Sequence, residues 1–381
     1  MLNSAFITLF LSIFVASLGI GMVSPLMPIY SQSLGAKGIW LGAIFSGFSL
    51  ARIIFMPLVG RLSDRRGRKI FITLGLLFYS FLSLGYIFSQ NLQQLIAVRF
   101  LHGVASAMVV PIAMAYIGEI SPKGEEGKFL GTFNIALFFG FGMGPLLGGV
   151  VTDKISQSAS FLAMGGLSLI SFLAILFFLP ASGSQKTRLS NKRFSFKLLL
   201  KDRLLQGLVL FRAFYAFGRG LVVTFLPILA ISHRASLTQI GLLISSSILL
   251  NSVLQYPFGK MADRYDKKKL LLLGSGISAF MLFLIPLGDN FLKLFLIALV
   301  LGIGGGISMP AGTALAAVVG KRRSGMGSTM GIYSMAMSAG LIFGPLTGGA
   351  IQSSWGINSV FFLGGLISVF GIACFYLVMV S

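Results

Sequence analysis

The sequence has few charged residues, two histidines and a single cysteine. Charged residues make up 10% of the 381 positions, too few to cover the surface of a water-soluble protein of this size. Cys374 is alone, which excludes an intramolecular disulfide, and its place in an apolar run favours a packing role. Because Asp, Glu, His and Cys form no cluster, the sequence argues against a metal site and against membrane enzymes that need one.

Apolar residues are abundant, at 56% of the chain, and they fall into twelve runs long enough to cross a bilayer as helices. The runs cover approximately residues 4–30, 39–60, 70–89, 94–118, 128–151, 159–180, 204–231, 238–258, 269–288, 292–318, 326–350 and 358–379. We therefore predict an all-α integral membrane protein. The first run is interpreted as a membrane helix and not a signal peptide, because it lacks a basic start and contains Pro25 and Pro28.

Basic residues indicate which side of the membrane each loop occupies. A net charge of +21 suggests nucleic-acid binding in a soluble chain, but here the cations lie in short loops between apolar runs. One set of alternate loops holds most of the Lys and Arg. The opposite set holds only Lys37, Lys154, Arg234 and Lys293. Because cytoplasmic loops are rich in these residues, we predict a cell (inner or plasma) membrane protein with both termini cytoplasmic and anionic lipids at that face.

The sequence is duplicated. Residues 1–180 and 204–381 each hold six runs, and the polar, basic stretch 181–203 is predicted to be a cytoplasmic linker. The charged loop at 60–69 recurs at 259–269, about 200 residues later. Since six is an even number of spans, the second copy enters from the same side, so the repeats are parallel. We predict two six-helix halves that pack on each other in a monomer.

These features together resemble the major facilitator superfamily, and the resemblance covers essentially the whole chain. It rests on twelve spans in two halves, the repeated charged loop, and Arg99-x-x-His102-Gly in the fourth span. The Gly-x-x-x-Gly-Pro-x-x-Gly-Gly stretch at 140–149 is similar to the signature of drug:proton antiporters. The Gly-Ile-Gly-x-x-x-Pro-x-x-Pro stretch at 19–28 resembles the first helix of tetracycline and multidrug exporters. The resemblance implies the major facilitator fold and a transporter, not an enzyme.

The glycines of the fifth and eleventh spans recur every four residues, so each set lines one helix face and lets another backbone approach closely. Pro145 removes one helix hydrogen bond and favours a bend. The residues assigned to helix packing and hinge motion are Gly140, Gly144, Pro145, Gly148, Gly149, Gly344, Pro345 and Gly348. Tight packing alone selects the same residues. The resemblance implies instead that span five slides on span eight, and span two on span eleven.

Each charged loop places an Asp just after a helix end, where it can lie against the positive N-terminus of another helix, an attraction of about 0.3–1 kcal/mol when exposed. Asp64 is predicted to face the start of span eleven, and Asp263 the start of span five. The residues assigned to this gate are Gly60, Asp64, Arg65, Gly67, Arg68, Glu119, Asp263 and Arg264, with Glu119 as a local partner for the loop arginines. The alternative is that the loops serve only as orientation signals and lipid anchors. We expect the first loop to be the stronger latch.

Four arginines lie within predicted spans, whereas no span holds an acid near its middle. Ionisable groups in a membrane are costly and usually functional. Arg212 and Arg219 lie two turns apart, on one face, with Tyr215 between them. The substrate-binding candidates are Arg99, Asn134, Arg212, Tyr215, Arg219, Asn251 and Gln255. The alternative for the arginines, which include Arg52, is a scaffold role.

The proton carrier that the resemblance implies is missing from its usual place. Tetracycline-type exporters carry an acid shortly before the first Gly-x-Gly, where this sequence has Phe-Val-Ala-Ser-Leu at 14–18. Histidine is the side chain that ordinarily titrates near neutrality, and His102 is the one within a span, one turn from Arg99, so it is the proton-coupling candidate. The alternative is a hydrogen-bonded packing residue.

Two transporter hypotheses remain open. The first is an exporter of small amphipathic organic molecules that is coupled to protons and works by alternating access. The second is an organic-anion exchanger or facilitator that holds its substrate through Arg212 and Arg219. A transporter-like sensor is a more remote third. None of them requires a cofactor, a metal or nucleic acid, and the expected partners are a small-molecule substrate, lipid and protons.

Overall fold

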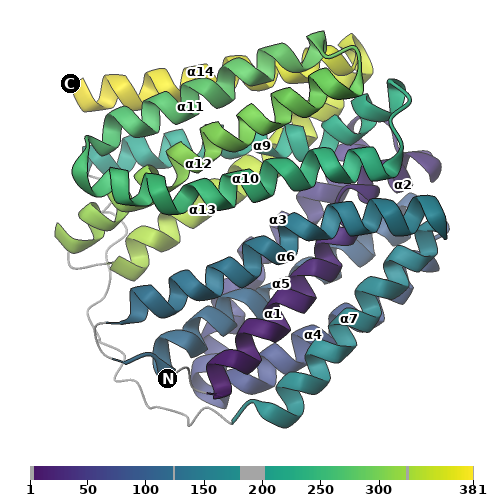
Figure 1. Cartoon of the computed structure of the whole chain (residues 1–381), viewed down its shortest axis with the longest axis vertical. Coiled ribbons are helices and arrows are strands. Elements are labelled where there is room, and N and C mark those ends of the chain that lie inside the picture. The colour runs from purple at the N-terminus through teal and green to yellow at the C-terminus, as the bar shows by residue number, and fades with distance from the viewer. Residues whose placement is uncertain (1–3, 123–124, 181–201, 323–325, 381) are drawn as a thin grey trace. The chain divides into compact units, whose positions relative to one another are not determined.

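The structure is a computed structural model that describes residues 4–122, 125–180, 202–322 and 326–380. Within these ranges it also leaves undescribed the side chains at 126–128, 263, 321–322, 326–328 and 380. All regular structure in the described part of the chain is helical (Figure 1). This confirms the all-α prediction.

The helices follow the predicted runs closely, and 12 of them are long and apolar enough to cross a membrane. Their bounds are α1 (Ser4–Val23), α2 (Leu26–Ser33), α3 (Ile39–Arg66), α4 (Arg68–Ile87), α5 (Leu92–Ile120), α6 (Glu126–Lys154), α7 (Gln157–Phe178), α9 (Arg203–Ser232), α10 (Leu237–Arg264), α11 (Lys267–Leu284), η1 (Ile285–Leu287), α12 (Phe291–Arg322), α13 (Met326–Trp355) and α14 (Ile357–Val380). The first predicted run is split in two because Pro25, which has no N–H, follows the last turn of α1.

Short polar side chains begin several of these helices. Asn91 accepts a hydrogen bond from the backbone N–H of Gln94 at 3.0 Å, and Ser156 accepts one from Ala159 at 3.1 Å. Each bond satisfies a donor that the first helical turn leaves without a partner. Gly67 separates α3 from α4 with a φ of 91°, in the left-handed region where a side chain is strained.

The chain folds into two compact units. The first consists of Met1–Gly35, Gly47–Ser190 and Ser236–Ser245, and the second of Ala36–Ser46, Asn191–Ala235 and Ser246–Ser381. Relative to the halves predicted from the sequence, each unit takes in one short segment from the other half. These segments are the first turns of α10, in the first unit, and the first turns of α3, in the second.

The two units use the same set of helix pairings. In the first unit, α1 packs on α6 and α7, and α4 packs on α5 and α7. In the second unit, α9 packs on α13 and α14, and α11 packs on α12 and α14. α1 and α9 are the first helices of the two halves, and the other paired helices follow them in the same order. The shared pairings therefore confirm the duplicated architecture.

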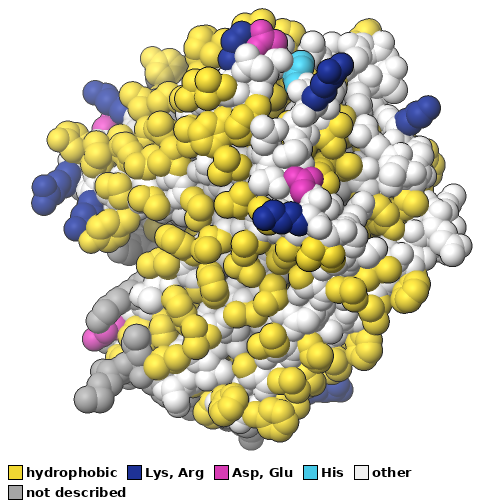
Figure 2. All heavy atoms as spheres, turned by 45° about the vertical axis from the view of Figure 1, so that its right-hand side comes forward, with side chains coloured by type: hydrophobic (Ala, Val, Ile, Leu, Met, Phe, Trp, Pro, Cys, Tyr) yellow, Lys and Arg dark blue, Asp and Glu magenta, His cyan; other side chains and the backbone are white. Residues whose placement is uncertain are grey.

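Large apolar side chains are exposed along the helices, among them Phe81, Phe88, Phe177 and Leu366. Figure 2 shows hydrophobic side chains spread over much of one face, with few charged ones between them. A water-soluble protein rarely exposes so much apolar surface, whereas lipid contact requires it. The chain is a multi-pass membrane protein.

The glycine face of α6 packs against α1. A Cβ atom at Gly144 would touch the backbone of Gly21, and one at Gly148 would touch the backbone of Met22. In the second unit, Gly344 on α13 meets the backbone of Phe217 on α9 in the same way. These glycines therefore hold helices together within each unit.

We expect Gly144→Ala to lower the free energy of unfolding by about 1–3 kcal/mol, because the added Cβ meets backbone that cannot give way. Unfolding of the purified protein in detergent measures this. Gly131→Ala is the matched control on the same helix, since a Cβ there meets nothing within 4 Å. Equal stability of the two variants would contradict the packing role.

Candidate functional site

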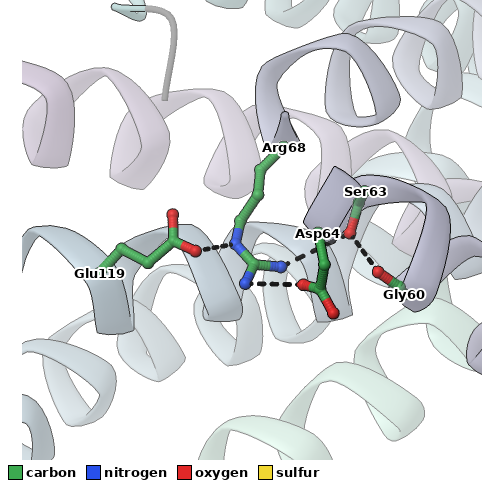
Figure 3. Close-up of polar contacts among 5 residues, drawn as sticks. All are labelled: Gly60, Ser63, Asp64, Arg68 and Glu119. Carbon is green, nitrogen blue, oxygen red and sulfur yellow. Dashed lines mark hydrogen bonds and ion pairs between the residues drawn. The ribbon is translucent and has the colours of Figure 1, made fainter. Parts of the chain in front are cut away.

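The first charged loop holds an ion network, the Arg68 network, formed by Asp64, Arg68 and Glu119. Arg68 Nη2 lies 2.9 Å from Asp64 Oδ1, and Arg68 Nε lies 2.5 Å from Glu119 Oε1 (Figure 3). The Arg68 side chain is 13% exposed, so both pairs are partly screened from water. The network ties the end of α3 and the start of α4 to α5, and Glu119 is the local partner that the sequence suggested.

The second charged loop is built differently. Asp266 begins α11 and accepts a hydrogen bond from the backbone N–H of Lys268 at 2.9 Å, at the place where the first loop has Gly67. The side chain of Asp263 lies outside the described residues. Arg65 and Arg264 are both exposed. The predicted contacts of Asp64 and Asp263 with helices of the opposite half join the two units and stay predictions.

A serine of another helix forms a hydrogen bond to the backbone near each of the prolines Pro145 and Pro345. In the first unit, Leu146 N–H donates a hydrogen bond to Ser245 Oγ at 2.9 Å. In the second unit, Ser46 Oγ donates one to the carbonyl of Ile342 at 2.6 Å. A proline weakens the local helix ladder, so a hydroxyl that reaches the backbone there compensates for it.

Beside each serine, a glycine lets the two helices touch. A Cβ at Gly241 would collide with the backbone of Pro145, and one at Gly42 with the backbone of Pro345. Spans five and eight, and spans two and eleven, therefore pack together as the resemblance implied. They do so partly through Pro145, Gly149 and Pro345, which the sequence analysis assigned to helix packing. The glycine and serine partners on the other helices were missed. The available signal was Gly-x-x-x-Ser, present at 42–46 and again at 241–245.

The carboxylate of Asp153, at the end of α6, caps the N-terminus of α10. Its Oδ2 accepts a hydrogen bond from Thr238 N–H at 2.7 Å, and its Oδ1 accepts one from Leu237 N–H at 3.2 Å. The carboxylate thus satisfies two donors that the helix leaves open and faces the positive end of its dipole. Sequence reasoning placed a helix-facing Asp in the charged loops and missed this one.

His102 is 1% exposed and is surrounded by three rings, which we call the His102 box. The ring centroids of Tyr79, Phe48 and Tyr86 lie 4.7, 5.5 and 5.8 Å from that of His102. Two of the span arginines border the box, since Arg99 lies over the Phe48 ring at 5.0 Å and Arg52 at 5.8 Å. Aromatic faces provide part of the stabilisation that these cations need away from water.

Hydrogen bonding in the box favours a neutral His102. The Tyr86 hydroxyl lies 2.7 Å from His102 Nδ1 and also bonds to Arg99. Because an arginine can only donate, the Tyr86 oxygen accepts from Arg99. Nε2 of the imidazole is buried without a hydrogen-bond partner, so a second proton on the ring has no acceptor. This arrangement suits a packing residue, and the proton-coupling role of His102 stays a prediction.

Arg212 lies in what we call the Arg212 cage, which consists of Arg212, Met309, Tyr333 and Met337. Its Nη1 contacts Met309 Sδ at 2.9 Å and its Nη2 contacts Met337 Sδ at 3.0 Å. Its guanidinium carbon lies 4.8 Å from the centre of the Tyr333 ring. The residue is 8% exposed. A buried cation is thus held by two thioethers and a π face.

Three further substrate-binding candidates lie close together in the second unit. The side chain of Gln255 donates a hydrogen bond to Asn251 Oδ1 at 2.8 Å. A Cβ at Gly305 on α12 would touch both Asn251 Nδ2 and the Tyr215 hydroxyl, so this glycine brings α10 and α9 polar groups together. Tyr215 is one turn from Arg212, which places this group next to the Arg212 cage along α9.

The remaining candidates are not part of this group. Arg219 is exposed although it was predicted on the same face as Arg212, and Asn134 is half-buried on α6. Arg99 belongs to the first unit, beside the His102 box. Among the residues that the structure describes, no three His, Cys, Asp or Glu side chains gather where they could hold a metal ion.

Comparison with known proteins identifies relatives over almost the whole chain. The profile of the Major Facilitator Superfamily matches residues 9–218 and 208–380. An uncharacterized transporter of this type from Methanocaldococcus jannaschii is 29% identical over 369 residues, covering 95% of this chain and 94% of the relative. The quinolone resistance protein NorA of Staphylococcus aureus is 27% identical over 363 residues, covering 92% and 90%.

Among solved structures, a bacterial homologue of the human lysosomal transporter Spinster, in an inward-facing and unoccupied conformation, shares the fold. The TM-score is 0.85 at 13% sequence identity, over 98% of this chain and 96% of the other.

We expect Asp153→Ala to lower the free energy of unfolding by about 1 kcal/mol, because two N–H groups of α10 lose their acceptor. Asp153→Asn keeps one acceptor oxygen and loses the charge, so its effect is smaller. Unfolding in detergent measures both. Asp289→Ala serves as control, because Asp289 is an exposed acid that bonds only to its neighbours Asn290 and Lys293. A loss equal to that of the control would show that the cap adds no stability.

We expect His102→Gln to retain any stimulation of transport by a pH gradient, because the glutamine oxygen still accepts from Tyr86. His102→Leu leaves the Tyr86 proton unpaired and lowers the free energy of unfolding by about 1–3 kcal/mol. Substrate flux in proteoliposomes, with and without a pH gradient, measures the stimulation. Loss of the gradient response in His102→Gln, with substrate exchange intact, would make His102 the proton carrier.

Proposed function

The chain belongs to the Major Facilitator Superfamily, and we propose that it exports small amphipathic organic molecules by alternating access, coupled to protons. The chain is a membrane transporter and not an enzyme. The observation that carries the export proposal is the similarity to a quinolone resistance protein, which runs through both repeats and 92% of the chain.

The surroundings of the polar candidates support an amphipathic substrate. Tyr215, Asn251 and Gln255 are a few polar groups beside a core of apolar and aromatic side chains in the second unit, which includes Phe211 and Phe375. Sites for organic molecules are usually apolar with a small number of placed polar groups. Such a site binds by burial of apolar surface and selects by a few hydrogen bonds.

The helix-end contacts support alternating access. The Arg68 network lies where α3 meets α4, and the Asp153 cap lies where α6 meets α10. By the alternation of spans these are opposite ends of the helices, so one contact set belongs to each membrane face. Bonds at helix ends worth about 0.3–1 kcal/mol each are weak enough to break and re-form during a transport cycle. On this basis we propose a gating role for the charged-loop residues. We also propose a hinge role for the glycines and prolines of α6 and α13.

The distribution of loop cations supports both termini on the cytoplasmic side of the cell membrane, with anionic lipids against the basic loops. Since each half is compact and carries its own repeat of the packing, we propose that the protein works as a monomer.

An organic-anion exchanger is the second candidate, and one observation favours it. Arg212 is a buried cation in the second unit that has thioethers and a ring as its partners. No acid of the described residues pairs with it.

Purified protein in proteoliposomes tests the proposed function. We expect transport of a quinolone and of the dye ethidium to be stimulated by an imposed pH gradient and to collapse when a protonophore removes it. Liposomes without protein are the control. Exchange of carboxylates that is indifferent to the gradient, together with no movement of ethidium, would replace this proposal by the anion exchanger.

A further inference from the structure

Arg212 carries a positive charge into the second unit, and none of the carboxylates described there lies beside it. Of the acids on this unit whose side chains are described, Asp202 begins α9, Asp266 begins α11, and Asp289 pairs with Lys293 at 2.7 Å. Asp202 is on the same helix as Arg212, but about 15 Å away along its axis at 1.5 Å per residue. The charge is therefore balanced by none of these side chains.

The partners that Arg212 does have are weak ones. A thioether sulfur is a poor hydrogen-bond acceptor, and a cation over a ring gains less than a cation paired with a carboxylate. Arg212 Nε makes no hydrogen bond. The Tyr333 hydroxyl is 4% exposed and interacts with Arg212, which can only donate to it, so its own O–H has no acceptor. Two buried groups with unused donors thus lie beside each other.

The two methionines are suited to being moved. Met309 and Met337 are half-buried, whereas Arg212 and Tyr333 are buried, so the cage is more accessible on its methionine side. A methionine side chain has three rotatable bonds and repacks at low cost. A carboxylate arriving from that side offers two oxygens in the spacing that a guanidinium binds best.

We propose that Arg212, together with the Tyr333 hydroxyl, binds the carboxylate of an amphipathic organic anion. The carboxylate displaces the thioethers of Met309 and Met337, which occupy its place in the free protein. The apolar body of the anion packs against the neighbouring core, where Phe211 and Leu315 lie. This inference rests on the proposed transport function, because it names the substrate class for the candidate site next to Tyr215.

Direct binding to the purified full-length protein tests the inference without requiring transport. The probe is naphthalene-1-carboxylate, and its uncharged amide has the same shape. We expect the carboxylate to bind more tightly than the amide, and Arg212→Gln to weaken carboxylate binding by about 10- to 100-fold while leaving amide binding unchanged. Tyr333→Phe weakens carboxylate binding by a smaller factor.

Matched variants separate the site from general damage. Arg234→Gln removes the same charge from an exposed position on the same unit and leaves binding unchanged. Replacing Met309 and Met337 together by Leu keeps the volume, removes the thioethers and leaves carboxylate binding equal or tighter. If Arg212→Gln does not fold, carboxylate binding by Tyr333→Phe and by the variant with Leu at Met309 and Met337 tests the inference.

Equal binding of carboxylate and amide by the unaltered protein would overturn the inference, as would full carboxylate binding by Arg212→Gln. Either result would make Arg212 a scaffold residue. A protein that binds the carboxylate but moves no substrate in proteoliposomes would instead contradict the proposed transport function and leave the binding site in place. The two failures are therefore distinguishable.

Discussion

Helices in a bilayer gain little by burying apolar side chains against one another, because lipid is equally apolar, so close backbone packing has to hold them together. The glycines of α13 do this for α9, since Gly340 meets the backbone of Ala213. Met337 lies one turn before Gly340 and contacts Arg212, the neighbour of Ala213. Met337 therefore belongs to the Arg212 cage because the backbones of α13 and α9 approach closely. The glycines of α6 place α1 in the first unit by the same means.

Charge is distributed in opposite ways at the helix ends and inside the spans. At the end of α3, Arg68 has two carboxylate partners. Inside the spans, Arg99 lies over Phe48, and Arg212 contacts thioethers and the ring of Tyr333. Cations buried away from water are costly. The carboxylate site proposed at Arg212 fits this cost, and it also fits the missing acid of the first span.

Duplication supplies the scaffold, and differences between the copies supply the asymmetry. The helix pairings are the same in both units, and in each unit a serine of another helix contacts the backbone near the span proline. Asp153 receives the start of α10, whereas Ser353, about 200 residues later, lies near Gly38 at the start of α3. Gly67 likewise has Asp266 as its counterpart. One copy of each feature therefore carries a charge that the other lacks.

The sequence by itself determined the helices, the duplication and the glycine faces. These follow from local patterns, because membrane thickness sets the length of a span and the helical period sets which residues share a face. It also indicated that Glu119 is a partner of the charged loop. Each of these inferences needs only residues within one helix or one repeat.

Only the tertiary structure decided which side chains meet across distant parts of the chain. Arg212 and Arg219 share a predicted face, but neighbours from α12 and α13 bury one while the other is exposed. Asp153 lies at the end of a span in the sequence, and only the fold places the start of α10 against it. The helical period fixes the direction in which a side chain points, but what it meets there depends on packing between residues far apart in sequence.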